Sequence, residues 1–132
     1  MPFQGPKYNP TLTTKAIAAI VRKDLKAALP EVKTSVRSTS SDITVDVVEL
    51  PAGVQIYSAS YLAKPQFDSP SPTYKYTAEF LRICAVAKET LDAYRRDDSD
   101  SQRDYFDSNF SANVQPAFDL RNAEWVARTG TV

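Results

Sequence analysis

Basic side chains gather in the first third of the chain at spacings that could build one anion-binding surface. At 100° per residue, Lys15, Arg22 and Lys26 fall on one face of a predicted helix, and two further cations share one face of the strand predicted to follow it. Such a cluster suits the phosphates of a nucleic acid or an acidic protein surface, and the alternative is a solvated helix face beside an exposed sheet face. The candidates for contact with an anionic partner are Lys15, Arg22, Lys23, Lys26, Lys33 and Arg37.

An acidic segment at 97–104 has carboxylates at alternate positions, as calcium-binding loops do. Read as such a loop, it places Arg103 where the sharp turn needs glycine, and no bidentate glutamate follows at the twelfth position. We therefore expect a solvated connection between a helix and a strand, in which nearby arginines balance the carboxylates, and no metal site.

The composition excludes most of the chemistry that enzymes perform with histidine or paired cysteines. The chain has no histidine, which removes Ser-His-Asp and Cys-His catalysis and histidine-ligated zinc. Its single cysteine, Cys84, lies on the apolar face of a predicted helix, where a free thiol behaves as a small hydrophobe. A reaction would have to rely on Asp, Tyr, Lys or Ser alone, so we expect no catalytic residue and no cofactor.

The tyrosines are the other candidates for contact with a partner. Tyr57 and Tyr105 lie in predicted strands, Tyr61 lies at the end of an alternative, longer form of the strand that begins at 54, and Tyr74 lies near the start of a predicted helix. Exposed tyrosine is favoured at interfaces, and the alternative is a ring half-buried at the edge of the core.

The charges balance, with 16 Lys and Arg against 16 Asp and Glu. The balance is a cancellation, because residues 1–37 hold seven cations against two acids, a net +5, and the remainder holds nine against fourteen, a net −5. Neutrality argues against a protein that coats nucleic acid indiscriminately. It leaves room for a local anion site and for head-to-tail self-association.

One cysteine cannot form an intramolecular disulfide, which favours a reducing compartment. No run of the sequence approaches the length of a membrane span. Residues 1–10 contain three prolines and no apolar segment of the kind found in signal peptides, so they predict an extended arm. We expect a cytoplasmic protein without membrane contact.

The periodicities predict a single domain over residues 1–132, with the element order α-β-β-β-α-β. Helices are predicted at 13–29 and 72–96, strands at 32–38, 43–50, 54–57 and 105–114, and a short helix at 120–127 within the tail 115–132. Asp24 is a misfit, because it projects inside the apolar arc of the first helix and needs either solvent or a cation. Two amphipathic helices over one face of a small antiparallel sheet make an α+β two-layer sandwich.

The predicted α-β-β-β-α order is also that of double-stranded-RNA-binding domains, which keeps direct nucleic-acid binding as an alternative function. Such domains place a lysine cluster at the start of their second helix. Here that position offers only Lys75, and topology by itself does not fix function.

Two stretches carry a resemblance to a known family. They are LTTKAIAAIVRKDLKAALPEVKTSVRS at 12–38 and YRRDDSDSQRDYFDSNF at 94–110. Together they resemble one of the large polyvalent protein-associated domains, a small domain of uncharacterised proteins from phages, plasmids and conjugative elements. The sequence departs from the family pattern at Thr34 and Ser111, where the family has aromatic residues, and at 47–51.

The resemblance implies a context rather than a reaction. Such domains occur among proteins thought to protect invading DNA or to counter host defences. It therefore implies a non-enzymatic protein of a phage or mobile element that inhibits a host defence protein or a nucleic-acid-processing protein, in the manner of an anti-CRISPR or anti-restriction factor, within the host cytoplasm. The basic residues named above largely coincide with the family's motif positions.

Overall fold

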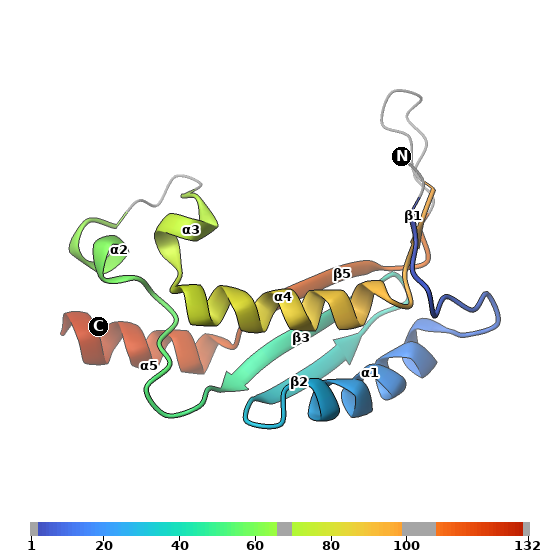
Figure 1. Cartoon of the computed structure of the whole chain (residues 1–132), viewed down its shortest axis with the longest axis horizontal. Helices are drawn as coiled ribbons and strands as arrows, with labels where there is room; N and C mark the ends of the chain where they lie inside the picture. Colours follow the sequence, from blue (N-terminus) through green and yellow to red (C-terminus); the bar gives the residue numbers. More distant parts are fainter. Residues whose placement is uncertain (1–2, 66–69, 99–107, 131–132) are drawn as a thin grey trace.

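A computed structural model describes residues 3–65, 70–98 and 108–130, and its centre is a three-stranded sheet (Figure 1). The strands are β2 (Lys33–Ser38), β3 (Asp42–Glu49) and β5 (Ser111–Pro116), in the order β2-β3-β5. β2 pairs with β3 as an antiparallel hairpin, whereas β5 lies parallel to β3. The sheet is therefore mixed rather than antiparallel throughout.

Two amphipathic helices, α1 (Thr14–Ala28) and α4 (Ala78–Asp92), lie side by side on one face of this sheet (Figure 1). Thr13 begins α1 by accepting a hydrogen bond from the amide of Ala16, and Thr77 caps α4 in the same way. The main core lies between the helices and the sheet and includes Leu25 and Val45. Burying an aliphatic side chain of this kind stabilises the fold by roughly 1.5–3 kcal/mol. The predicted α+β two-layer arrangement is confirmed.

The strand predicted at 54–57 is absent from the described sheet, and β5 occupies the third place instead. Tyr57 makes only an isolated bridge, with Tyr76, and is followed by the short helix α2 (Ala59–Ala63). The backbone amides of this segment bind a side chain from the far end of the chain, as described below, and so do not join a strand. The order of the main elements becomes α-β-β-α-β, which is not that of a double-stranded-RNA-binding domain.

The helix predicted at 72–96 is interrupted. A single turn, α3 (Pro72–Lys75), precedes α4, and Tyr76 between them is extended, with φ −113° and ψ 155°. Thr77 then starts the second helix, and its hydroxyl also donates to the carbonyl of Gln55 at 2.5 Å. The hydroxyl of Thr77 thus both caps α4 and ties it to the loop after β3.

The predicted extended N-terminal arm contains a short strand. β1 (Phe3–Gln4) pairs antiparallel with β4 (Arg96–Asp97), which follows α4. The next residue, Gly5, donates its amide to the carbonyl of Arg95 at 2.8 Å. A Cβ atom at Gly5 would lie 2.0 Å from the carbonyl oxygen of Asp92, so only glycine allows the arm to approach this closely.

The tail folds as α5 (Phe118–Thr129), which is longer than the predicted helix and begins after Ala117 rather than at Asp119. Gly130 ends it in the left-handed conformation, with φ +70°. β5 begins at Ser111, and part of the strand predicted at 105–114 lies outside the described residues. In the described part of the chain, no helix is long and apolar enough to cross a membrane.

Candidate functional site: a basic groove at the edge of the sheet

Three of the six candidate cations line a single groove, which we call the α1–β2 groove. Arg22 and Lys26 reach it from α1, and Lys33 reaches it from the start of β2. The groove has a volume of about 800 Å³ and runs from the C-terminal half of α1, past the turn at 29–32, along the outer side of β2. The sequence placed these cations on two separate elements, and the packing of α1 against β2 brings them together.

Arg22 is tied to the edge of the sheet. Its Nη2 donates to the carbonyl oxygen of Val36 at 2.9 Å, although the side chain belongs to α1 and Val36 belongs to β2. A guanidinium carries five N–H donors, so this bond leaves donors for a further acceptor in the groove. Arg22 is thereby held in a fixed place rather than swinging freely in solvent.

Apolar and acidic residues complete the groove. Leu29, Val32 and Val36 supply apolar lining, whereas Glu31 and Glu49 stand at the same groove and partly offset its positive charge. The lining of the groove therefore combines three cations and two acids with apolar side chains.

Arg37 is not part of this groove. Its Nε donates to Asp46 Oδ2 at 2.7 Å, on the face of the sheet away from the helices, and Gln115 donates to the same carboxylate. The bond from Arg37 is the main reason that the pKa of Asp46 lies below its usual value, and it raises the pKa of Arg37 in turn. Strict alternation had placed Lys33 and Arg37 on one face, but the pairing with β3 shifts register between Lys33 and Thr34.

Lys15 and Lys23 are exposed on α1 but do not line the groove. Lys15 lies along the same side of the helix as Arg22 and Lys26, about two turns before Arg22 and about three before Lys26, and Lys23 points away from the sheet. The predicted patch is therefore a groove with three cations, flanked by two more on the outer surface of α1.

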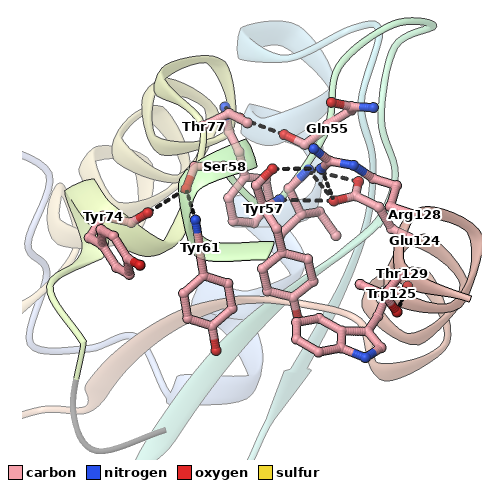
Figure 2. Close-up of polar contacts among 12 residues, drawn as sticks. Gln55, Tyr57, Ser58, Tyr61, Tyr74, Thr77, Glu124, Trp125, Arg128 and Thr129 are labelled. Carbon is pink, nitrogen blue, oxygen red and sulfur yellow. Dashed lines mark hydrogen bonds and ion pairs between the residues drawn. The ribbon is translucent and has the colours of Figure 1, made fainter. Parts of the chain in front are cut away.

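Two of the predicted contact tyrosines are buried. Tyr57 and Tyr61 are 7% and 4% exposed and stack with ring centroids 5.6 Å apart, and Trp125 of α5 meets both rings edge-on (Figure 2). They form a second, smaller core at the end of the sheet, so a role in contact with a partner is not available to them in this fold. Tyr74 is half-buried against Tyr61, and Tyr105 lies outside the described residues.

A carboxylate that sequence reasoning missed holds this second core together. Glu124 of α5 accepts hydrogen bonds from the amides of Ile56 and Tyr57 at 2.7–2.9 Å (Figure 2). Arg128, one turn later, donates to the Tyr57 carbonyl at 2.6 Å and to Glu124 at 3.1 Å. We call these two side chains the α5 clamp. The only signal in the sequence was their i, i+4 spacing, which is also common on solvated helices.

The misfit Asp24 has both a donor and a cation. The hydroxyl of Tyr94, which follows α4, donates to its carboxylate, and Lys7 of the N-terminal arm lies 4.0 Å from it. Burial and this hydrogen bond raise the pKa of Tyr94 to about 12. Asp24 thus joins three separate parts of the chain and performs a structural task.

The remaining candidates for chemistry are Cys84 and the acidic segment at 97–104. Burial raises the pKa of the Cys84 thiol to about 11, so the thiol is protonated at neutral pH and is a poor nucleophile. In the acidic segment, Asp97 pairs with Arg95 at 3.2 Å, and the residues from 99 to 104 lie outside the described part. Among the described residues, no three acidic or cysteine side chains are grouped as metal ligands would be.

Comparisons of the chain with models of protein families, with curated proteins and with solved structures find no match.

Proposed function

We propose that this protein is a non-enzymatic binding protein that holds an acidic segment of a protein partner in the α1–β2 groove. The observation that carries the proposal is the convergence of Arg22, Lys26 and Lys33, from two elements, on one groove with an apolar floor. Carboxylates of the partner would meet the cations, and its apolar side chains would cover the floor. Charge complementarity of this kind steers association and selects the partner.

The resemblance to a domain of phages and conjugative elements supports a biological context for this binding. Arg22, Lys26 and Lys33 are among the positions that match the family's opening motif. In that context the partner is a host defence protein or a nucleic-acid-processing protein, and the chain acts in the host cytoplasm by covering the partner's working surface. An inhibitor of the anti-CRISPR or anti-restriction kind is the concrete form of the proposal.

Direct binding of nucleic acid is the second candidate. It is favoured by the four exposed cations of α1, which are Lys15, Arg22, Lys23 and Lys26. Duplex and single-stranded DNA and RNA would each be titrated with the protein at low and moderate salt. A nucleic-acid complex would weaken steeply as salt rises, with a slope set by the number of phosphates contacted. No binding at low salt would remove this candidate.

The lead proposal is tested with the wild type and two variants as bait proteins, each variant reversing one positive charge on α1. Lys26→Glu reverses a groove cation, whereas Lys23→Glu makes the same change three residues earlier on the outer surface of α1. All three baits are incubated with nuclease-treated bacterial lysate. The proposal expects proteins that wild type and Lys23→Glu retain and Lys26→Glu loses. Identical capture by all three baits, or none by any, would refute it.

A further inference from the structure

β2 is an edge strand, and hydrogen bonds within the sheet show which of its backbone groups point outward. The amides of Ser111 and Ala117 donate to the carbonyls of Ser41 and Val47, so the odd-numbered residues of β3 bond toward β5. The even-numbered residues of β3 must then bond toward β2. The amide of Thr39, just after β2, donates to the Asp42 carbonyl at 2.9 Å, as this requires.

The register between β2 and β3 completes the assignment. Ser35 and Arg37 lie opposite even-numbered residues of β3 and bond to them, so Thr34, Val36 and Ser38 direct their N–H and C=O groups away from the sheet. One of these groups is occupied, because the Val36 carbonyl accepts from Arg22. Within the described residues, the outward groups of Thr34 and Ser38 have no hydrogen-bond partner.

An unpaired strand edge is a template for a further strand, and peptides use such edges through their backbones. Arg22 occupies the Val36 carbonyl, which is where an added strand would place an N–H donor, so strand addition exchanges this bond for one from the added backbone and frees the guanidinium. Thr34 and Val36 also line the α1–β2 groove, so the edge and the groove form one continuous surface.

From this geometry we infer that the partner's acidic segment enters the α1–β2 groove as an extended strand that adds to the edge of β2, an inference that rests on the proposed function. Side chains alternate along a strand, so every second residue of the added strand would point toward α1. There it would meet Arg22 and Lys26. The chemistry that fits is therefore an extended polypeptide with glutamate or aspartate at alternate positions.

A second copy of this chain does not fit the same edge. β2 reads KTSVRS, with two cations and no acid, so pairing two copies of β2 would bring like charges together. An acidic strand from a partner would instead meet Lys33 of β2 together with Arg22 and Lys26 of α1. Charge complementarity thus selects a foreign acidic strand over self-association.

The test uses a fluorescein-labelled peptide that alternates glutamate with valine and threonine, with binding to the full chain followed by fluorescence anisotropy. Two further peptides carry N-methyl groups on alternate amides, one set in each frame. In an added strand, only one frame directs its amides toward β2. We expect one N-methylated peptide to bind at least tenfold more weakly and the other to bind like the parent.

A variant of the protein tests the same backbone hydrogen bonds by changing β2 instead of the peptide. Thr34→Pro removes an amide that points away from the sheet and removes no hydrogen bond to β3. An edge strand accepts proline at such a position. Thr34→Ala keeps the amide and is the comparison. We expect Thr34→Pro to weaken binding at least fivefold and Thr34→Ala to weaken it by clearly less, because Thr34→Ala keeps the amide and loses only part of one side chain of the groove. Circular dichroism tests whether both variants fold. If Thr34→Pro does not fold, the N-methylated peptides decide the question with the wild-type protein.

The outcomes separate this inference from the function on which it rests. If both N-methylated peptides bind like the parent while Lys26→Glu weakens all three, the groove recognises charge without adding a strand, and the inference alone is overturned. If the peptide binds equally to wild type and Lys26→Glu, the proposed function fails as well. A dimer in sedimentation that the peptide does not disperse, or no peptide binding at all, also overturns strand addition at this edge.

Discussion

Removing the Glu124 carboxylate should destabilise the fold by an amount that the structure lets us work out. The carboxylate is the acceptor for the amides of Ile56 and Tyr57, and both of these residues are buried. In Glu124→Ala the two amides lose their partner, and each buried unsatisfied donor costs about 1–3 kcal/mol. The side chain of Glu124 is only 14% exposed, so solvent does little to replace it. We therefore expect a loss of about 3 kcal/mol.

Thermal unfolding followed by circular dichroism measures this loss. For a chain of this length, about 3 kcal/mol corresponds to a decrease in Tm of roughly 10 °C. Glu124→Gln keeps one acceptor oxygen and should lie between the wild type and Glu124→Ala. Glu89→Ala is the matched control, because it removes an exposed glutamate from α4 and should change stability by no more than about 0.5 kcal/mol.

Hydrogen exchange locates the effect. The amides of Ile56 and Tyr57 should lose protection in Glu124→Ala, while amides of β3 remain protected up to the lowered global stability. A loss below about 1 kcal/mol, with both amides still protected, would refute the reasoning. It would mean that other groups satisfy the segment and that the α5 clamp is not what holds it.

Three further predictions concern the rest of the molecule. Gly5→Ala should lower the stability by several kcal/mol or detach the N-terminal arm, because its Cβ would lie 2.0 Å from the Asp92 carbonyl oxygen, and limited proteolysis of the arm distinguishes the variant from wild type. Tyr94→Phe should cost about 1–2 kcal/mol of unfolding free energy through the lost bond to Asp24. Because folding raises the pKa of Tyr94, the stability that its hydroxyl contributes is present below pH 10 and is lost toward pH 12. In denaturant titrations over that range, the unfolding free energy of the variant should therefore fall less steeply than that of the wild type. Alkylation of Cys84 should accelerate about tenfold per pH unit from pH 7 to beyond pH 9 in the folded protein, whereas levelling off near pH 9 would show an ordinary thiol.

Local periodicity was enough to predict the elements that pack by their own amphipathic pattern. The helix predicted at 13–29 is α1 at Thr14–Ala28, and the hairpin predicted at 32–38 and 43–50 is β2 and β3 within a residue at each end. In these elements the apolar spacing and the threonine cap lie within a few residues of one another, so the sequence contains the whole signal.

The errors fall where the deciding partner is distant in the sequence. The segment 54–57 alternates like a strand, but its amides bind Glu124, which lies 68 residues after Ile56. The third place in the sheet goes to β5, whose pairing with β3 joins residues about as far apart. The residues within either segment do not show which distant group or strand it will bind, because an alternating pattern specifies which face is buried and not which strand lies beside it.

The candidate site was predictable to the same degree. Helical spacing placed Arg22 and Lys26 together correctly, because one helix fixes their relative position. The sequence could not show that Lys33 lines the groove while Arg37 does not. The register shift beside Lys33 and the carboxylate that binds Arg37 both depend on the pairing with β3. That Arg22 bonds to the edge of β2 requires the tertiary packing of α1 on the sheet.

The arrangement of the two cores makes the binding and stability predictions independent. The α5 clamp belongs to the smaller core, with Tyr57 and Trp125, whereas the α1–β2 groove lies on the outer side of the main core. Lys26 and Lys33 are exposed and make no ion pair within the described residues, so reversing their charge removes no ion pair. Lys26 lies in the last turn of α1, where replacing a cation by a carboxylate costs about 0.3–1 kcal/mol through the helix dipole. Effects at sites without shared partners add. A Lys26→Glu protein that melts like the wild type but no longer binds an acidic peptide therefore reports on recognition alone, and a Glu124→Ala protein that melts early but binds normally reports on the fold alone.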